Sequence, residues 1–361
     1  MRNLVSQTLL GPSTLLVVLA CLAGCAGMDS SLMSEAVQMT SAQEARLGAA
    51  VEGRLLQMLG GRYHKQALIE ELQSSVEQEL GSVAHFTVAI ADKNTAALYA
   101  LPDDRVVLTR GLLAKIRDQG ELVSLLQRAA ALTVTDSMAR SSRASHKATT
   151  EILSLQESLY DPESGSIRLA RIFARKPCAE SCLTSSSPAN LSSSGTLPES
   201  IRLLKELQPA YALLEEARQL EKDNHTAQAI TLYLKAAAMA PDEPYILGAL
   251  GTAYLRAGEL QTARLNLQKA VRLQPDYYRT RMGLGYLYLQ QGKVTKANDQ
   301  LAESVRLLPV TENLFLLAEA REKGGDVEGG MSLYRLIVDK DPQSKLGRTA
   351  ASRLAHAKGV Q

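Results

Sequence analysis

The chain has 361 residues, of which 45% are hydrophobic, and its 40 lysines and arginines nearly balance 38 acidic residues. This length is typical of two domains, and the apolar content is sufficient for globular cores. The near-neutral charge argues against a nucleic-acid partner, which usually leaves a basic patch or tail. No phosphate-binding loop of the G-x-x-x-x-G-K-[ST] type occurs, and we expect no cofactor.

Residues 1–24 have the organisation of a bacterial signal peptide. One arginine precedes an apolar run at 15–22, which is too short to span a membrane as a stable helix. Leu22-Ala23-Gly24-Cys25 resembles the lipobox of bacterial lipoproteins, in which the cysteine is lipidated. The resemblance implies a lipid on Cys25 that binds the membrane, and a tether over 25–40. Because Ala26 follows the cysteine, it also implies an outer-membrane location facing the periplasm. An ordinary secretory signal with a chance cysteine is the alternative.

Residues 41–175 predict an α+β domain. Apolar residues at helical spacing predict helices at 41–59 and 64–80. The period then changes, and short apolar runs at 85–90, 97–101 and 105–109 predict strands. Pro102-Asp103-Asp104 is a turn signal, so the last two strands should form a hairpin. Helical patterning returns from Gly111 to about Arg140, with a break near Gly120.

Four phrases in this domain resemble the N-terminal part of M48-family zinc metallopeptidases. They are the opening helix at 40–48, the segment 94–102, the segment 105–113 with its Thr109-Arg110-Gly111-Leu112-Leu113, and the helix start at 121–126. Their order and spacing agree with that family over 41–135. The resemblance implies a zincin-like fold and a domain order similar to peptidases of this family that carry tetratricopeptide tails.

The zinc motif of that family is missing. In the family, H-E-x-x-H follows the helix start; its histidines hold zinc and its glutamate activates the zinc-bound water. Here Arg128, Ala129 and Leu132 stand at the His, Glu and His positions, and none can serve as ligand or base. The resemblance therefore implies a degenerate zincin-like domain without catalytic or metal-binding residues. A working metallopeptidase with unusual zinc ligands is the alternative.

Residues 176–205 separate this domain from the next one. Cys178 and Cys182 remain after signal removal, and in an oxidising compartment we expect a disulfide between them, with two free thiols as the alternative. Residues 183–198 are rich in serine, with prolines and a glycine. Such a composition cannot bury a core, so it predicts a flexible linker.

Residues 206–361 repeat themselves. Pro241, Pro275, Pro309 and Pro342 are spaced by 34, 34 and 33 residues. Small and large residues recur at fixed distances before them: Ala229, Ala263 and Ala297; Gly251 and Gly285; Tyr233, Leu267 and Leu301. This pattern matches the tetratricopeptide repeat, in which helix pairs stack into an all-α solenoid. A last helix at about 344–358 should cover the end of the stack.

In that family the first helix of each repeat lines the concave face, and a few of its side chains point inward. Here these positions carry Tyr245, Thr252, Arg256, Arg279, Met282, Tyr286 and Gln290. Tyrosine, methionine and arginine are enriched at protein interfaces, so we expect a protein or peptide partner, with ordinary solvated residues as the alternative. The sequence thus predicts a non-catalytic adaptor of the cell envelope, in outer-membrane protein assembly or quality control. A pure repeat scaffold, with 41–175 as a remnant, is the other non-enzymatic interpretation.

Overall fold

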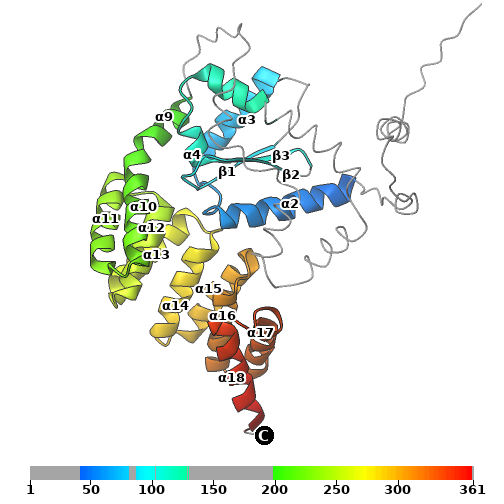
Figure 1. Ribbon diagram of the computed structural model, residues 1–361, viewed down its shortest axis with the longest axis vertical. Coiled ribbons are helices and arrows are strands. Elements are labelled where there is room, and N and C mark those ends of the chain that lie inside the picture. The colour runs from blue at the N-terminus through cyan, green and yellow to red at the C-terminus, as the bar shows by residue number, and fades with distance from the viewer. Residues whose placement is uncertain (1–40, 81–86, 102, 128, 130–197, 360–361) are drawn as a thin grey trace, which may run out of the picture.

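The computed structural model describes residues 41–80, 87–101, 103–127, 129 and 198–359. They form a small α/β region with a three-stranded sheet, followed by an array of helices (Figure 1). Cys25, Cys178, Cys182, Arg128 and Leu132 lie outside the described residues. No helix in the described part of the chain is both long enough and apolar enough to cross a membrane.

The sheet contains β1 (Thr87–Ala91), β2 (Leu98–Leu101) and β3 (Arg105–Thr109), which confirms the three predicted strands. The strand order is β1-β3-β2, with β1 parallel to β3 and β2 antiparallel to it. The predicted hairpin is therefore present. Its turn places Asp103 and Asp104 at positive φ, a conformation that aspartate tolerates better than most residues.

Helices cover both faces of the sheet. Helix α2 (Ser41–Met58) packs on one face, where its Val51 and Leu55 contact Val107 of β3. Helix α3 (Gln66–Leu80) packs on the other face, where Leu68 and Leu72 join the neighbouring strand residues Val106 and Leu108. Because side chains alternate between the faces of a strand, covering both faces explains why nearly every strand residue is buried and apolar.

The core beside α3 is completed by segments that lie far apart in the sequence. Strand β3 leads directly into α4 (Arg110–Leu113), and a further helix occupies residues 119–127, so the helical break falls at 114–118. Helix α9 (Glu199–Glu206), at the end of the predicted linker, buries Ile201 and Leu204 in the same core. The chain thus contacts the α/β region again immediately before it enters the helical array.

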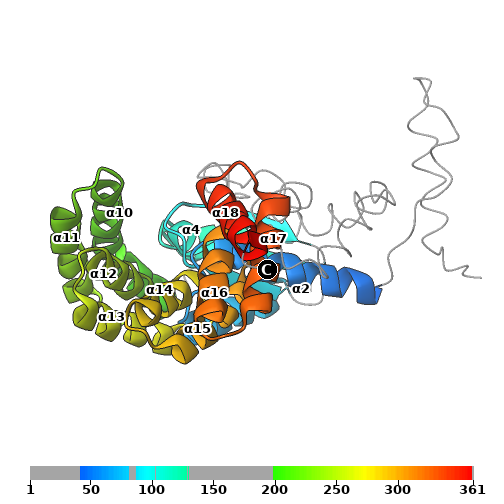
Figure 2. The ribbon, with the colours of Figure 1, turned by 90° about the horizontal axis from the view of Figure 1, so that it is seen from below.

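The array consists of successive helices that pack as neighbours, and its inner and outer sides are distinct. Figure 2 shows an arc with α10, α12, α14 and α16 toward its inner side and α11, α13 and α15 toward its outer side. The α/β region lies on the inner side of this arc. The helices are α10 (Gln208–Lys222), α11 (Thr226–Met239), α12 (Pro244–Arg256), α13 (Leu260–Leu273), α14 (Tyr278–Gln290), α15 (Val294–Leu307), α16 (Thr311–Lys323), α17 (Val327–Lys340) and α18 (Lys345–Gly359).

Small residues at repeated positions allow the paired helices to approach closely. A Cβ atom on Gly251 of α12 would lie 2.7 Å from Leu267 Cγ and 3.1 Å from the Leu267 backbone nitrogen of α13. Gly285 of α14 meets Leu301 of α15 in the same way, at 2.6 Å. In these two repeats the glycine and the leucine are therefore complementary in size, which explains why both recur at the repeat spacing.

We predict that Gly251→Ala destabilises the protein, because its methyl group has no space unless α12 and α13 separate. The expected loss is about 1–3 kcal/mol, the usual cost of overpacking. Urea unfolding followed by circular dichroism measures it. Gly53→Ala is the matched control: Gly53 lies in α2, and a Cβ atom there would have no neighbour within 4 Å, so helix propensity should stabilise that variant by up to about 1 kcal/mol. Equal stability of the two variants would contradict the packing argument.

Candidate functional site

The α/β region contacts the repeats through the turn that joins α2 and α3. Gly60 and Gly61 both have positive φ, of 100° and 91°. A Cβ atom on Gly60 would lie 3.3 Å from Tyr245 Cε2, and one on Gly61 would lie 3.1 Å from Tyr277 Cδ2. Only glycine combines this backbone conformation with such a close approach. The turn therefore fits directly against two tyrosines of the array.

Two glutamine side chains tie the same turn to the start of α14. The Gln57 amide of α2 donates to the Asp276 carbonyl and accepts a hydrogen bond from the Tyr278 backbone N–H at 3.0 Å. The Gln274 amide donates to the Arg62 carbonyl. Helix α14 has no side-chain cap from its own N-cap residue, Tyr277. Gln57 thus satisfies one of the free N–H groups of that helix from another part of the chain.

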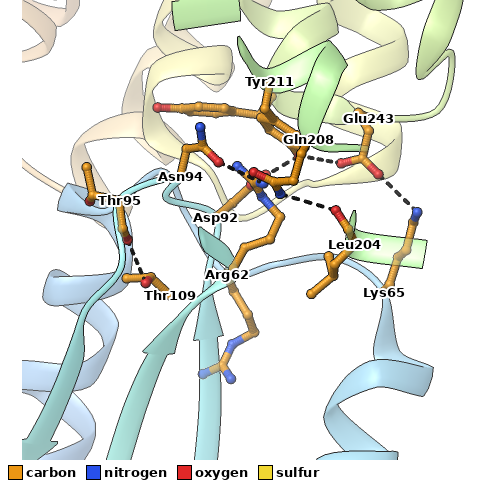
Figure 3. A network of polar contacts seen from close by, with 12 residues as sticks. Arg62, Lys65, Asp92, Asn94, Thr95, Thr109, Leu204, Gln208, Tyr211 and Glu243 are labelled. Carbon is orange, nitrogen blue, oxygen red and sulfur yellow. Dashed lines mark hydrogen bonds and ion pairs between the residues drawn. The ribbon is translucent and has the colours of Figure 1, made fainter. Parts of the chain in front are cut away.

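An ion pair is buried at the centre of the contact between the α/β region and the array (Figure 3). Arg110, the first residue of α4, donates from Nε to Asp92 Oδ1 at 2.8 Å, and both side chains are fully buried. The Arg110 guanidinium carbon lies 3.1 Å from the ring centroid of Tyr211 of α10. Its Nη1 is 3.4 Å from Asn94 Oδ1. One arginine therefore joins the end of β1, the start of α4 and the first repeat helix.

The Tyr211 hydroxyl extends this network to the second repeat. It lies 2.6 Å from Glu243 Oε2, at the N-cap of α12, and 3.2 Å from Asp92 Oδ1. A hydroxyl carries one proton, so it can donate fully to only one carboxylate, and the shorter distance assigns that bond to Glu243. Lys65 Nζ pairs with the other Glu243 oxygen at 3.0 Å (Figure 3). Four segments far apart in the sequence thus share one polar network.

Burial decides the charge state of several groups in this network. Burial raises the pKa of Asp92, an effect that the Arg110 charge opposes. It also raises the pKa of Tyr211 and Tyr63, so both phenols stay neutral. Burial lowers the pKa of His64, which favours the neutral imidazole. The negative charge of Asp92 is therefore tolerated in this buried position because the Arg110 cation lies beside it.

Replacing Arg110 with methionine should strongly destabilise the protein, because the Asp92 carboxylate would stay buried without its cation. The expected loss in the free energy of unfolding is about 3–5 kcal/mol. Arg306→Met is the control, since Arg306 pairs with Glu303 at 2.6 Å but its side chain is 68% exposed. Loss of that pair should change stability by less than about 1 kcal/mol. Urea unfolding of both variants checks the difference, and similar effects would show that the buried pair is not a major stabilising contact.

The predicted concave-face residues of α12 already contact other groups of the same chain. The Tyr245 hydroxyl accepts a hydrogen bond from Arg218 Nη1 at 2.8 Å, and its ring is buried. The Thr252 hydroxyl donates to the Gly248 carbonyl of its own helix at 2.9 Å. Arg256 is exposed and pairs with Glu221 at 2.7 Å. Within this helix, Arg256 is the predicted residue most accessible to a partner.

The predicted residues of α14 are more accessible. Tyr286 is 38% exposed, and Arg279 and Gln290 are exposed as well. Met282 is half-buried and packs against the core of the later repeats. Arg279 lies over Tyr278, with 5.1 Å between guanidinium carbon and ring centroid. The structure thus brings Arg279 near Tyr245 through the intervening tyrosines, whereas Tyr286 and Gln290 lie farther along the helix.

Asp92, Arg110, Tyr211 and Glu243 were not among the predicted site residues. One available signal was the repeat spacing, because Tyr211 stands 34 residues before Tyr245 and 68 before Arg279, which places all three at one repeat position. Another was Arg110, a lone charge between the apolar end of β3 and Gly111-Leu112-Leu113. Neither signal could show that the two residues meet.

Of the three positions aligned with the M48 zinc motif, the structure describes only Ala129. Ala129 is fully buried in the core beside α3. Among the described residues, no group of three or more histidines, cysteines, aspartates or glutamates could hold a metal ion.

Comparison with known proteins identifies the array. The tetratricopeptide-repeat family model matches residues 214–278, 249–310 and 282–345. The C-terminal part of the chain therefore consists of tetratricopeptide repeats, as predicted. The match does not reach the α/β region, so the resemblance to M48 metallopeptidases stays a prediction. No curated protein matches the chain.

Several solved structures are similar to part of the chain. MamA from Desulfovibrio magneticus RS-1, from residue 41 to its end, is 20% identical, with a TM-score of 0.35; the match covers 42% of this chain and 96% of that one. The first TPR of Spaghetti (RPAP3), bound to the HSP90 peptide SRMEEVD, is 22% identical with a TM-score of 0.32, covering 33% and 94%. The Sgt2 TPR domain from Aspergillus fumigatus is 19% identical with a TM-score of 0.32, covering 33% and 82%.

Proposed function

We propose that this protein is a non-catalytic adaptor whose repeats bind a segment of a partner protein. The observation that carries the proposal is the accessible inner side of α14, where Tyr286 is 38% exposed and Gln290 is also exposed. Exposed tyrosine gives a large contact area at a small entropic cost, which is why interfaces are enriched in it. The α/β region leaves these residues uncovered, while it occupies the beginnings of α12 and α14.

The α/β region acts in this proposal as a fixed neighbour of the binding face. Its contacts with the array involve the Gly60–Gly61 turn, glutamine hydrogen bonds and a buried ion pair that lies against Tyr211, all of which fix its position. A degenerate M48-like origin is supported by the sequence phrases alone. At the glutamate position of the zinc motif, Ala129 offers no base and is buried, which supports a role without catalysis.

We further propose that lipid on Cys25 holds the adaptor at the outer membrane, facing the periplasm. The support is the order of a charged start, an apolar run and Leu22-Ala23-Gly24-Cys25. Several acyl chains on one cysteine would anchor the protein firmly, whereas a single chain binds only weakly. An adaptor in this position would meet outer-membrane proteins during their assembly or quality control.

The binding face is tested by photo-crosslinking in bacterial cells that produce the full chain. A photoreactive phenylalanine analogue replaces Tyr286, and in a second variant it replaces Leu265 of the outer helix α13, which is 62% exposed. We expect a discrete covalent adduct with another protein from position 286 and little from position 265. Equal adducts from both positions, or none from 286, would count against a partner on the inner side.

The anchor is tested by replacing cysteines in the signal segment. Cys25→Ser should abolish labelling with radioactive palmitate and move the protein from the membrane fraction to the soluble fraction. Cys21→Ser is the matched control, because Leu19 is bulky where the lipobox requires a small residue; this variant should keep its label. A Cys25→Ser protein that still carries lipid would contradict the proposed anchor.

A further inference from the structure

The first turn of α14 carries an unusual charge distribution. It contains Arg279 and Arg281 and no acidic residue. A helix N-terminus already carries a partial positive charge, so cations there are unfavourable. The corresponding helix α16 has Glu312 in its first turn, which is the favourable arrangement. Local rules of this kind are most often broken at functional sites.

The two arginines of this turn have different surroundings. Arg281 donates to the Pro275 carbonyl at 2.5 Å and to Gln300 Oε1 at 3.0 Å. Its hydrogen bonds are therefore made to neutral groups of the chain. Arg279 is exposed and lies over the Tyr278 ring, and no carboxylate of the described residues forms an ion pair with it. Arg279 is therefore the arginine of this turn that can bind an anion.

A second arginine, on α10, lies at the other end of a group of neighbouring tyrosine rings. Arg218 lies 4.4 Å from the centroid of the Tyr245 ring. The ring centroids of Tyr245 and Tyr277 are 5.7 Å apart, as are those of Tyr277 and Tyr278. Together Arg218, Tyr245, Tyr277, Tyr278 and Arg279 form what we call the arginine–tyrosine row, which crosses α10, α12 and α14.

The arginines are the accessible part of the row. Tyr245, Tyr277 and Tyr278 are 7%, 4% and 3% exposed, and the Gly60–Gly61 turn packs against the first two. The Arg218 side chain is 27% exposed, and its carboxylate neighbour Glu215 lies at 3.6 Å with 46% exposure. Exposed pairs of this kind contribute little, so Glu215 does not compete strongly with a ligand.

We infer that the arginine–tyrosine row binds an acidic segment of the partner protein, whose carboxylates contact Arg218 and Arg279. The inference rests on the proposed function and adds the chemical class of the partner segment. A guanidinium matches a carboxylate with two parallel N–H donors, and the tyrosine rings beneath hold both arginines in place. The arginines belong to different repeats with α12 between them, so one extended segment needs two acidic residues to contact both of them.

A display library of random dodecapeptides, selected on the purified full chain, tests the inference. Selected peptides should be enriched in aspartate and glutamate, and their affinity should fall as salt rises. Arg279→Gln should weaken their binding roughly tenfold, as expected for losing one charge-assisted hydrogen-bonded pair. Arg218→Gln combined with Arg279→Gln should weaken it further. Arg272→Gln is the matched control, an exposed arginine on the outer helix α13, and should leave binding unchanged.

The outcomes separate this inference from the proposed function. Selected peptides without acidic residues, or acidic peptides that bind the Arg279→Gln variant as well as the original chain, would overturn the arginine–tyrosine row and leave peptide binding intact. Failure to select any peptide would count against both. Because Arg279 is exposed and forms no ion pair within the described residues, its replacement should not lower the unfolding temperature, and an unfolding temperature at least as high as that of the original chain excludes misfolding as the cause of lost binding.

Discussion

The contact of Arg110 with Asp92 and the Tyr211 ring is the interaction on which the arrangement of this protein most depends. A buried guanidinium is unfavourable unless its charge is matched, and here Asp92 and Asn94 of the β1–β2 loop accept hydrogen bonds from it while the Tyr211 ring of the first repeat lies against it. Tyr211 also bonds Glu243, so the same network reaches the second repeat. The ion pair lies within the α/β region, and the Tyr211 ring of the array covers its guanidinium.

The contact between the α/β region and the array limits how much of the concave side of the repeats is accessible. Gly60 and Gly61 lie on Tyr245 and Tyr277, and Gln57 caps α14, so the first part of the inner face contacts the protein's own α/β region. Farther along, Arg279 and Tyr286 stay exposed. An external segment would therefore bind beside the α/β region and could contact both parts. The described α/β region thereby acquires a physical role beside the repeats.

The phrase that resembles M48 peptidases also has a local structural explanation. The Thr109 hydroxyl accepts hydrogen bonds from the Ala97 and Leu112 N–H groups and donates to the Thr95 carbonyl, which ties β3 to its neighbours and caps α4. Gly111 is needed because a Cβ atom there would lie 1.7 Å from the Asn94 carbonyl oxygen. Arg110 forms the buried pair. These residues thus support the packing of the α/β region.

The sequence by itself determined the elements whose signals are local. Short apolar runs specified the three strands, and recurrent glycine, alanine and proline positions specified the helix pairs, because each signal reflects the packing of one element or of one repeat. The sequence also selected α14 as a surface helix with a partner-binding composition. Only the tertiary structure decided that Tyr245 is covered, that Arg110 meets Tyr211, and that Arg218 and Arg279 lie on one row of tyrosine rings. Those contacts join residues far apart in the chain. Their energies depend on burial and on distances in space, and neither quantity can be derived from the spacing of residues in one sequence.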